Sequence, residues 1–310
     1  MRPRGPVPIR RTVSDFVTGP RRSHDRGPPG PFVPSWEPLE VRGQPGGTEL
    51  NGTNRIQGRR ALITGASSGI GAAVARALAE RGVHLVLAAR RGERAHALAA
   101  ELADRHGVQA EAHALDVRDR QAVQAFGDRL EEQGLEVDIL VNNAGLARGL
   151  APFHEGVLDD YEEMIDTNVK GLILVSRRFL PPMVKRNRGH VVHIGSIAGY
   201  QVYPGGNVYN ASKFAVRALA EAMNVDLVGT AVRVSSVDPG LVQTEFSQVR
   251  FHGDTERAAT VYRGYTPLAP EDVADVVCFV LNAPPHVNVA DLILLPTDQR
   301  SSTVVHKEPV

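Results

Sequence analysis

Tyr209 and Lys213 stand four residues apart in the segment YNASK, and their side chains can support proton transfer. On a helix, residues at this spacing share one face. A free phenol has a pKa of about 10 and is a poor base at neutral pH, but a nearby ammonium stabilises the phenolate. Ser196, thirteen positions before Tyr209, can donate a hydrogen bond to a substrate oxygen. These catalytic candidates predict chemistry on a hydroxyl or carbonyl group, with Ser196 and Tyr209 also binding the substrate.

Short apolar segments alternate with helical stretches from about Arg59 onward. Strands are expected at residues 61–65, 84–90, 109–117, 138–145, 189–196, 232–240 and 290–296. Strands and helices that alternate this regularly predict right-handed crossovers and a doubly wound parallel sheet. The expected fold class is therefore α/β, with a Rossmann-type sheet. The fold alone does not decide a function.

The first predicted strand runs directly into a glycine-rich turn that is followed by a helical stretch. Glycine permits a tight turn at the first position, close backbone approach to a pyrophosphate at the second, and close helix–strand packing at the third. The helix N-terminus then directs free N–H groups at the phosphates. The turn predicts a dinucleotide site that includes Gly65, Ser67, Ser68, Gly69, Ile70 and Gly71.

The end of the second predicted strand is where such a site selects its cofactor. A site specific for NAD usually places a carboxylate there to hold the ribose 2′-hydroxyl. This chain has Ala89 followed by Arg90 and Arg91, and a guanidinium suits a 2′-phosphate dianion. Two solvated arginines that open a helix would give the same pattern. We predict NADP(H) as the cofactor, held by both arginines.

The composition narrows the range of partners. Lysine plus arginine number 35, as do aspartate plus glutamate, so no net field would recruit nucleic acid or an anionic membrane. No apolar run approaches the roughly 18 residues that a membrane span needs. The single cysteine, Cys278, lies in the apolar segment VVCFVL and is expected to be an ordinary buried thiol. We expect a cytoplasmic protein with a small-molecule substrate and no bound metal.

The first 55 residues differ in composition from the rest. They hold ten of the chain's 21 prolines and show no sustained apolar period, which is typical of disorder. An arginine-rich targeting or nucleic-acid-binding arm is the alternative, but prolines and interspersed acidic residues oppose it. We predict a disordered extension over residues 1–55 and a single α/β domain over residues 56–310.

The order and spacing of these motifs resemble the short-chain dehydrogenase/reductase family. The shared features are TGxxxGIG, NNAG, YxxxK and a later Pro-Gly pair. The resemblance implies that Lys213 also holds the nicotinamide ribose and that Asn168 is a fourth catalytic residue, which orients Lys213 through a water relay. It implies further cofactor contacts at Asp116, Val117, Asn143, Ala144, Gly145, Tyr209, Pro239, Gly240 and Thr244.

The resemblance covers residues 61 to about 306 and points to one group within the family. The stretches NNAGLARG, MIDTNVKGL and EFSQVRFHGD are similar to NADP-dependent serine or 3-hydroxy acid dehydrogenases, which include L-allo-threonine dehydrogenase and malonic semialdehyde reductase. This implies a small 3-hydroxy acid or its oxo counterpart as substrate. Arg250 would anchor the carboxylate, unless it is a surface arginine or part of a salt bridge. Arg148 is a departure, since a small apolar residue is more usual there.

Two other functions stay open. A carbonyl reductase for apolar ketones would line a wider pocket with aromatic side chains, namely Tyr161, Tyr200, Tyr203 and Phe246. A protein that senses NADP without catalysis is the other, although it would not need all four catalytic candidates. His190 and His193 precede Ser196, but no GxSxG elbow accompanies them, so we expect them to be structural strand residues.

The C-terminal segment bears on assembly. An apolar strand such as ADLILLP, residues 290–296, promotes aggregation when it is left open at a sheet edge. The resemblance places this strand and the helix around residues 272–281 at a subunit contact, with the chain after Pro296 near a neighbour's substrate loop. Pairing across a two-fold axis would cover the edge, so we expect a homotetramer.

Overall fold

A computed structural model describes residues 53–308 of the chain. The predicted extension over residues 1–55 therefore lies outside the described residues, except for its last three. These contact the body of the chain: the backbone N–H of Arg55 donates to Asn282 Oδ1 at 2.7 Å, and Asn282 Nδ2 donates to the carbonyl of Thr53 at 2.9 Å. None of the helices in this part of the chain is both long and apolar enough to cross a bilayer.

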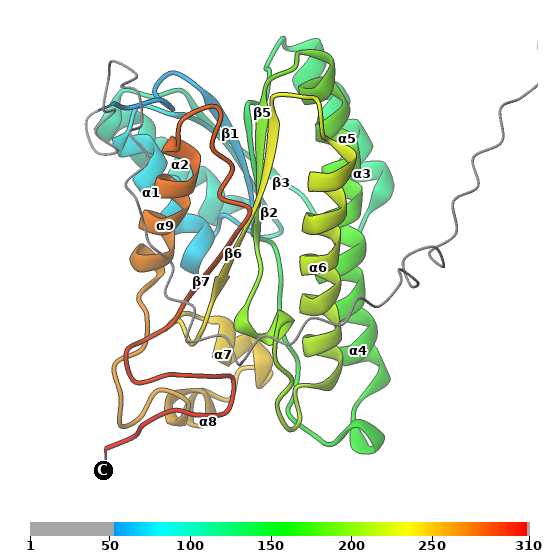
Figure 1. Cartoon of the computed structure of the whole chain (residues 1–310), viewed down its shortest axis with the longest axis vertical. Helices are drawn as coiled ribbons and strands as arrows, with labels where there is room; N and C mark the ends of the chain where they lie inside the picture. The colour runs from blue at the N-terminus through cyan, green and yellow to red at the C-terminus, as the bar shows by residue number, and fades with distance from the viewer. Residues whose placement is uncertain (1–52, 309–310) are drawn as a thin grey trace, which may run out of the picture. The chain divides into compact units, whose positions relative to one another are not determined.

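In the described part of the chain, seven parallel strands form one sheet in the order β3-β2-β1-β4-β5-β6-β7 (Figure 1). The strands are β1 (Arg60–Thr64), β2 (His84–Ala89), β3 (Ala110–Ala114), β4 (Ile139–Asn142), β5 (Gly189–Ile194), β6 (Val232–Pro239) and β7 (Asp291–Leu294). The order changes direction between β1 and β4, as a doubly wound sheet requires. The predicted Rossmann-type fold is confirmed, and each predicted strand is present with slightly different bounds.

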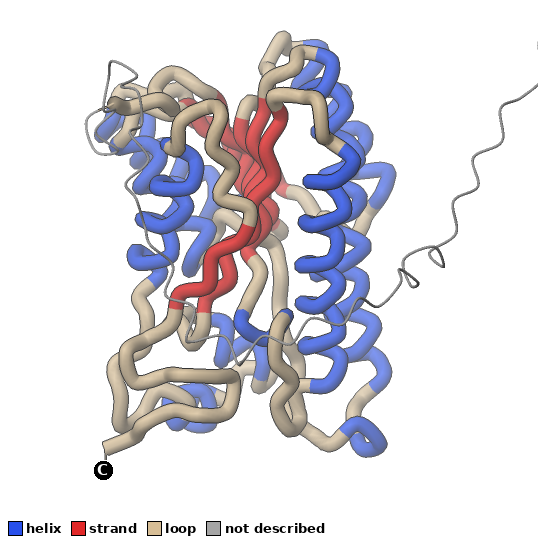
Figure 2. The backbone as a smooth tube through the Cα atoms, in the orientation of Figure 1, coloured by secondary structure: helices blue, strands red, loops and turns tan. Residues whose placement is uncertain are grey.

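Helices cover both faces of this sheet (Figures 1 and 2). One face carries α1 (Gly69–Glu80), α2 (Gly92–His106) and α9 (Pro270–Asn282). The other carries α3 (Arg120–Glu132), α5 (Leu172–Lys185) and α6 (Asn207–Asp226). Shorter helices are η1 (Phe153–Glu155), α4 (Leu158–Ile165), η2 (Asp166–Gly171), η3 (Ile197–Gly199), α7 (Phe246–Arg250) and α8 (Thr255–Thr260).

The strands are continuous apolar runs in the sequence because both faces of the sheet are buried. In β1, Ile63 packs into the layer with α1, α2 and α9, while its neighbour Leu62 packs into the layer with α3, α5 and α6. Successive side chains of a strand point to opposite faces, so both residues are fully buried. A strand that is covered on both sides needs no polar alternation. The resulting rigid sheet fixes the positions of the loops at its ends.

The loops that follow the strands gather at the end of the sheet where α7 and α8 also lie (Figure 2). Parallel strands all present their carboxyl ends there, and ligands of open α/β sheets bind at this edge. The C-terminal segment returns to the same region. Gln299 Oε1 accepts a hydrogen bond from the N–H of Leu241 at 2.9 Å, and the N–H of Glu308 donates to the carbonyl of Gly264 at 2.7 Å. Residues after Pro296 thus contact the loops of their own chain.

Candidate active site

A cavity of about 760 Å³ opens at the carboxyl ends of the strands. This volume is ample for a dinucleotide cofactor together with a small substrate. Its lining contains every predicted site residue except Gly71 and Asn168. The structure therefore brings together segments that are almost two hundred residues apart in the chain, from Gly65 to Arg250.

The glycine-rich turn has the backbone geometry that the sequence predicts. Gly65 and Gly69 have φ values of +66° and +53°, in the left-handed region that glycine tolerates. A Cβ on Gly71 would lie 2.4 Å from Asn143 Nδ2 and 2.5 Å from the carbonyl oxygen of Gly65. Gly71 thus serves close packing behind the turn rather than lining the cavity. Helix α1 begins at Gly69, so its free N–H groups face the cavity end of the sheet.

Arg91 spans the gap between this turn and the start of α7. Its Nη2 donates to Ser68 Oγ at 2.6 Å, and its Nη1 donates to Glu245 Oε2 at 2.8 Å. Arg90 points elsewhere, with Nη1 3.4 Å from Glu163 Oε1. Both guanidiniums line the cavity. Arg91 can offer charge-assisted hydrogen bonds to an anion placed beside Ser68, whereas Arg90 is directed at Glu163.

Tyr209 and Ser196 both line the cavity. Tyr209 lies on α6, and Ser196 follows β5 and precedes η3. The Ser196 hydroxyl accepts from the N–H of Ala198 at 3.1 Å, which fixes its direction. Both residues are less than a tenth exposed. The phenol and the hydroxyl can therefore contact the same substrate oxygen.

Lys213 lies one turn after Tyr209 and is held by the sheet. Its Nζ donates to the carbonyl of Ile194 at 2.8 Å and lies 6.0 Å from the centroid of the Tyr209 ring. Burial lowers the pKa of Lys213 to about 8. Burial raises the pKa of Tyr209, while Arg250 and the nearby Ser196 hydroxyl act in the opposite direction. Arg250, with its guanidinium carbon 5.1 Å from the ring centroid, is closer to the phenol than Lys213 is.

Asn168 lies behind the cavity in η2, a π-helical turn between α4 and α5. Its Oδ1 accepts from the N–H of Leu146 at 2.8 Å, and its Nδ2 donates to the carbonyl of Leu146 at 2.8 Å and to Ser212 Oγ at 3.0 Å. Such π turns are frequent at functional sites. Asn168 thus ties the loop after β4 to the residue beside Lys213.

Arg250 lies in the cavity, on the last turn of α7. Its Nη2 donates to the phenol oxygen of Tyr203 at 2.8 Å, and its guanidinium carbon is 5.3 Å from the centroid of Phe246. Its Nε is buried and has no hydrogen-bond partner in the described part of the chain. Within those residues Arg250 pairs with no carboxylate, so the salt-bridge alternative finds no partner there.

Comparison with known proteins identifies the family. Residues 59–254 match the family model described as short chain dehydrogenase. The chain belongs to the short-chain dehydrogenase family. It is 47% identical over 239 residues to the NADP-dependent 3-hydroxy acid dehydrogenase YdfG of Salmonella typhi, which covers 77% of this chain and 95% of that protein. The predicted family and enzyme class, an oxidoreductase acting on CH–OH groups, are confirmed.

Further relatives agree with this family assignment. The NADP-dependent 3-hydroxy acid dehydrogenase of Schizosaccharomyces pombe is 40% identical over 256 residues, covering 82% of this dehydrogenase and 99% of that protein. A solved structure of serine dehydrogenase, in its closed form with NADP+, aligns with a TM-score of 0.75 at 43% identity. That alignment covers 80% of this chain and all of the other.

Several charged residues at the site of this dehydrogenase could not be predicted from the sequence. Glu245 pairs with Arg91 at 2.8 Å and with Arg94 at 3.0 Å, so a carboxylate occupies the side of the cavity where an anion is predicted. Arg118 hydrogen-bonds Asp116 at 2.6 Å, and this contact lowers the pKa of that carboxyl. Asp116 is thereby held as a carboxylate at the end of β3.

Asp238 is a second carboxyl group that the sequence reading missed. Its Oδ1 accepts from the N–H of Ser196 at 3.0 Å, and burial, together with Asp291, raises its pKa. A Cβ on Gly195 would lie 1.8 Å from the same oxygen, so the close approach of Asp238 requires glycine there. Asp238 therefore supports the backbone of Ser196 from behind.

The two histidines of β5 are structural, as predicted. His193 Nδ1 lies 3.2 Å from Asn142 Nδ2, and burial lowers its pKa to about 4, so its ring is neutral at pH 7. His190 Nε2 lies 2.8 Å from Ser235 Oγ. Neither residue lines the cavity.

Replacing Arg250 with methionine should raise the pKa of Tyr209 further, because the substitution removes a cation that favours the phenolate. Oxidation requires the phenolate, so the rate should reach its plateau at a higher pH and should fall at pH 7. The pH profile of kcat/KM for a neutral alcohol measures this shift without the added loss of a carboxylate contact.

Arg257→Met is the matched control for this experiment. Its guanidinium carbon lies 4.3 Å from the centroid of Phe251, an equivalent aromatic contact, but it does not line the cavity. Its profile should coincide with that of the parent. If Arg250→Met also coincided with the parent, Arg250 would have no influence on the phenol.

Proposed function

We propose that this dehydrogenase transfers a hydride between NADP(H) and a small 3-hydroxy acid or its oxo counterpart. The observation that carries the substrate class is the position of Arg250 beside Tyr209, with a buried Nε that has no partner within the described residues. A guanidinium in this position can bind a carboxylate through two N–H groups and orient the adjacent carbon. Relatives named as 3-hydroxy acid dehydrogenases support the same class.

The residues at the adenine end fit NADP(H). The glycine-rich turn lines the cavity at the N-terminus of α1, where a pyrophosphate would bind, and Arg91 donates to the hydroxyl of Ser68. A 2′-phosphate held by Arg91 would replace Glu245 as the partner of that guanidinium. When bound, NADP(H) accepts or supplies the hydride.

Three side chains would carry out the chemistry, and a fourth would position them. Tyr209 removes the hydroxyl proton in oxidation and returns it to the oxygen in reduction. Ser196 donates a hydrogen bond to the same oxygen, where negative charge develops. Lys213, whose Nζ is held by the carbonyl at the end of β5, would bind the nicotinamide ribose. Asn168 links α6 to the loop after β4.

The alternative carbonyl reductase receives less support from the cavity. Tyr203 and Phe246 line it, but Tyr161 and Tyr200 do not. Tyr161 donates to the carbonyl of Phe153 instead, and Tyr200 donates to Asp291. Two of the four expected aromatic side chains therefore lie elsewhere, and one of the remaining two, Tyr203, is bonded to Arg250.

Turnover of 3-hydroxyisobutyrate or serine, followed by NADPH absorbance, tests the proposed function. We expect kcat/KM to exceed that of the corresponding methyl ester by at least about a hundredfold, since the ester cannot pair with Arg250 and leaves it unpartnered. The ester is the matched control, because it keeps the reacting hydroxyl. Faster reduction of an aryl ketone would indicate the carbonyl reductase. Tight NADPH binding without any turnover would indicate a sensor.

Ala89→Asp should shift cofactor preference toward NAD(H). The new carboxylate would repel a 2′-phosphate and accept a hydrogen bond from a ribose hydroxyl. Arg91→Leu should act in the same direction, and each change should lower the NADP/NAD ratio of kcat/KM at least about tenfold. Arg94→Leu is the control, because Arg94 also binds Glu245 but does not line the cavity. Equal use of both cofactors by the parent would contradict the assignment.

We also propose a cytoplasmic homotetramer in which residues 1–55 are a dispensable extension to a domain of residues 56–310. The strand β7 lies at the edge of the sheet and exposes Ile293, which supports a contact between subunits there. Light scattering on the full chain and on a chain that begins at residue 56 should give four times the subunit mass for both, with equal activity. A monomeric mass with full activity would refute the assembly, and an insoluble short chain would refute the domain boundary.

A further inference from the structure

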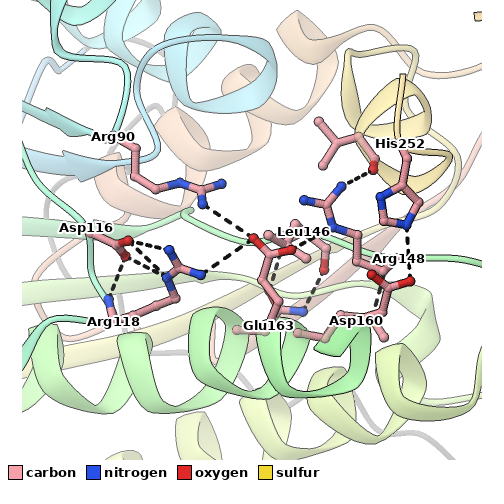
Figure 3. Close-up of polar contacts among 11 residues, drawn as sticks. Arg90, Asp116, Arg118, Leu146, Arg148, Asp160, Glu163 and His252 are labelled. Carbon is pink, nitrogen blue, oxygen red and sulfur yellow. Dashed lines mark hydrogen bonds and ion pairs between the residues drawn. The ribbon is translucent and has the colours of Figure 1, made fainter. Parts of the chain in front are cut away.

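Arg148, in the loop after β4, makes one contact with α4 and one with α7. Its Nε donates to Glu163 Oε2 at 2.7 Å, and its Nη1 donates to the carbonyl of Val249 at 2.5 Å (Figure 3). The side chain is only 17% exposed, although it lies on the rim of the cavity. Arg148 lies three positions after the last residue of the NNAG segment. The partly buried ion pair with Glu163 joins the loop after β4 to α4, and the hydrogen bond to Val249 joins the same loop to α7.

The carbonyl that Arg148 binds belongs to the last turn of α7. A helix of five residues cannot stabilise itself, and its final carbonyls have no partners within the helix. The guanidinium supplies a donor to one of them and a positive charge at the helix C-terminus, where charge of that sign is favourable. Arg148 thus contributes directly to the stability of α7.

Two neighbouring contacts hold the same end of α7. The N–H of Gly149 donates to the carbonyl of Arg250 at 2.9 Å, and Gly149 has a φ of +59°, which a side chain would disfavour. Past the helix, His252 Nε2 lies 3.1 Å from Asp160 Oδ2 on α4 (Figure 3). The loop after β4 therefore contacts the C-terminal end of α7 at Val249 and Arg250. Helix α4 contacts the chain just beyond it, at His252.

Arg148 is not free to bind an anion itself. Glu163 neutralises it and also lies within 3.4 Å of Arg90 and 3.6 Å of Arg118. Burial opposes ionisation of Glu163, but the hydrogen bond from Arg148 and the charges of these arginines outweigh it and lower its pKa. The carboxylate is therefore charged at neutral pH and keeps the Arg148 guanidinium turned toward α4 and α7.

We propose that Arg148 is a positioning residue: its guanidinium, fixed by Glu163, holds α7 so that Arg250 stays beside Tyr209 to receive the substrate carboxylate. The inference rests on the proposed function of Arg250. It predicts that the loss of Arg148 weakens substrate binding more than it slows the chemical step. At saturation the substrate carboxylate itself keeps Arg250 in place, so kcat is largely preserved.

Steady-state kinetics with 3-hydroxyisobutyrate test this role. Arg148→Leu should raise KM about tenfold and change kcat by less than about threefold. Arg148→Lys should recover part of the loss, because an ammonium can reach one of the two partners but not both. Arg186→Leu is the matched control, since Arg186 also donates to a backbone carbonyl, that of Val137 at 2.8 Å, and lies 3.5 Å from Glu136, outside the cavity. Its KM should not change.

Glu163→Gln separates positioning from direct binding. If Arg148 positions α7, the loss of the carboxylate should loosen the guanidinium and raise KM. If Arg148 instead binds the substrate carboxylate, the same change should release it toward the cavity and lower KM. A lower KM would therefore overturn the proposal.

Hydrogen exchange of the backbone amides of residues 246–250 gives a readout that needs no substrate. Exchange in this segment should be faster in Arg148→Leu than in the parent, intermediate in Arg148→Lys and unchanged in Arg186→Leu. Unchanged exchange in Arg148→Leu would overturn the inference even if KM rose. Failure of the parent to oxidise any 3-hydroxy acid would refute the proposed function instead, while the exchange result would still decide whether Arg148 holds α7.

Discussion

The side-chain amide of Asn168 joins the two halves of the active site. Both of its N–H groups and its oxygen are used, on the backbone of Leu146 and on Ser212, and the residue is almost fully buried. Leu146 follows the strand that ends at the cofactor cavity, whereas Ser212 lies between Tyr209 and Lys213. A buried polar group that loses its partners costs about 1–3 kcal/mol, so these contacts resist separation. Asn168 therefore helps to fix the position of helix α6 relative to the cavity.

The parts of this arrangement that sequence predicts are those set by local rules. Apolar runs covered on both faces gave the parallel strands, and the turn from Gly65 to Gly71 needs glycine whatever surrounds it. The spacing of Tyr209 and Lys213 places both on one face of α6, because a helix of 20 residues has a fixed period. Asn168 was predicted by resemblance, but the π turn that aims it inward has no local signature.

The partners of charged residues could not be predicted, because an arginine has the same neighbours in sequence whether it is solvated or paired. Glu245 is separated from Arg91 by 154 positions, and only the folded sheet brings them to one edge. The role of Asp238 could not be predicted for another reason. The segment VDPG indicates the end of a strand, and nothing in it indicates a hydrogen bond to the backbone of Ser196. Arg148 was visible as a departure from the family pattern, but its partner on α4 was not.

The arginines that line the cavity differ in whether a carboxylate pairs with them, and this difference distinguishes the two ends of the site. At the adenine end, Arg91 faces Glu245 and Arg90 faces Glu163. At the catalytic end, Arg250 pairs with no carboxylate among the described residues: it donates to the phenol of Tyr203 and lies against the rings of Tyr209 and Phe246. Arg148 is paired with its own carboxylate, Glu163. A guanidinium charge in a site with few polar neighbours attracts an anion more strongly than a solvated or paired one. Among the described arginines that line the cavity, Arg250 is therefore the one without a carboxylate partner, and it lies beside Tyr209.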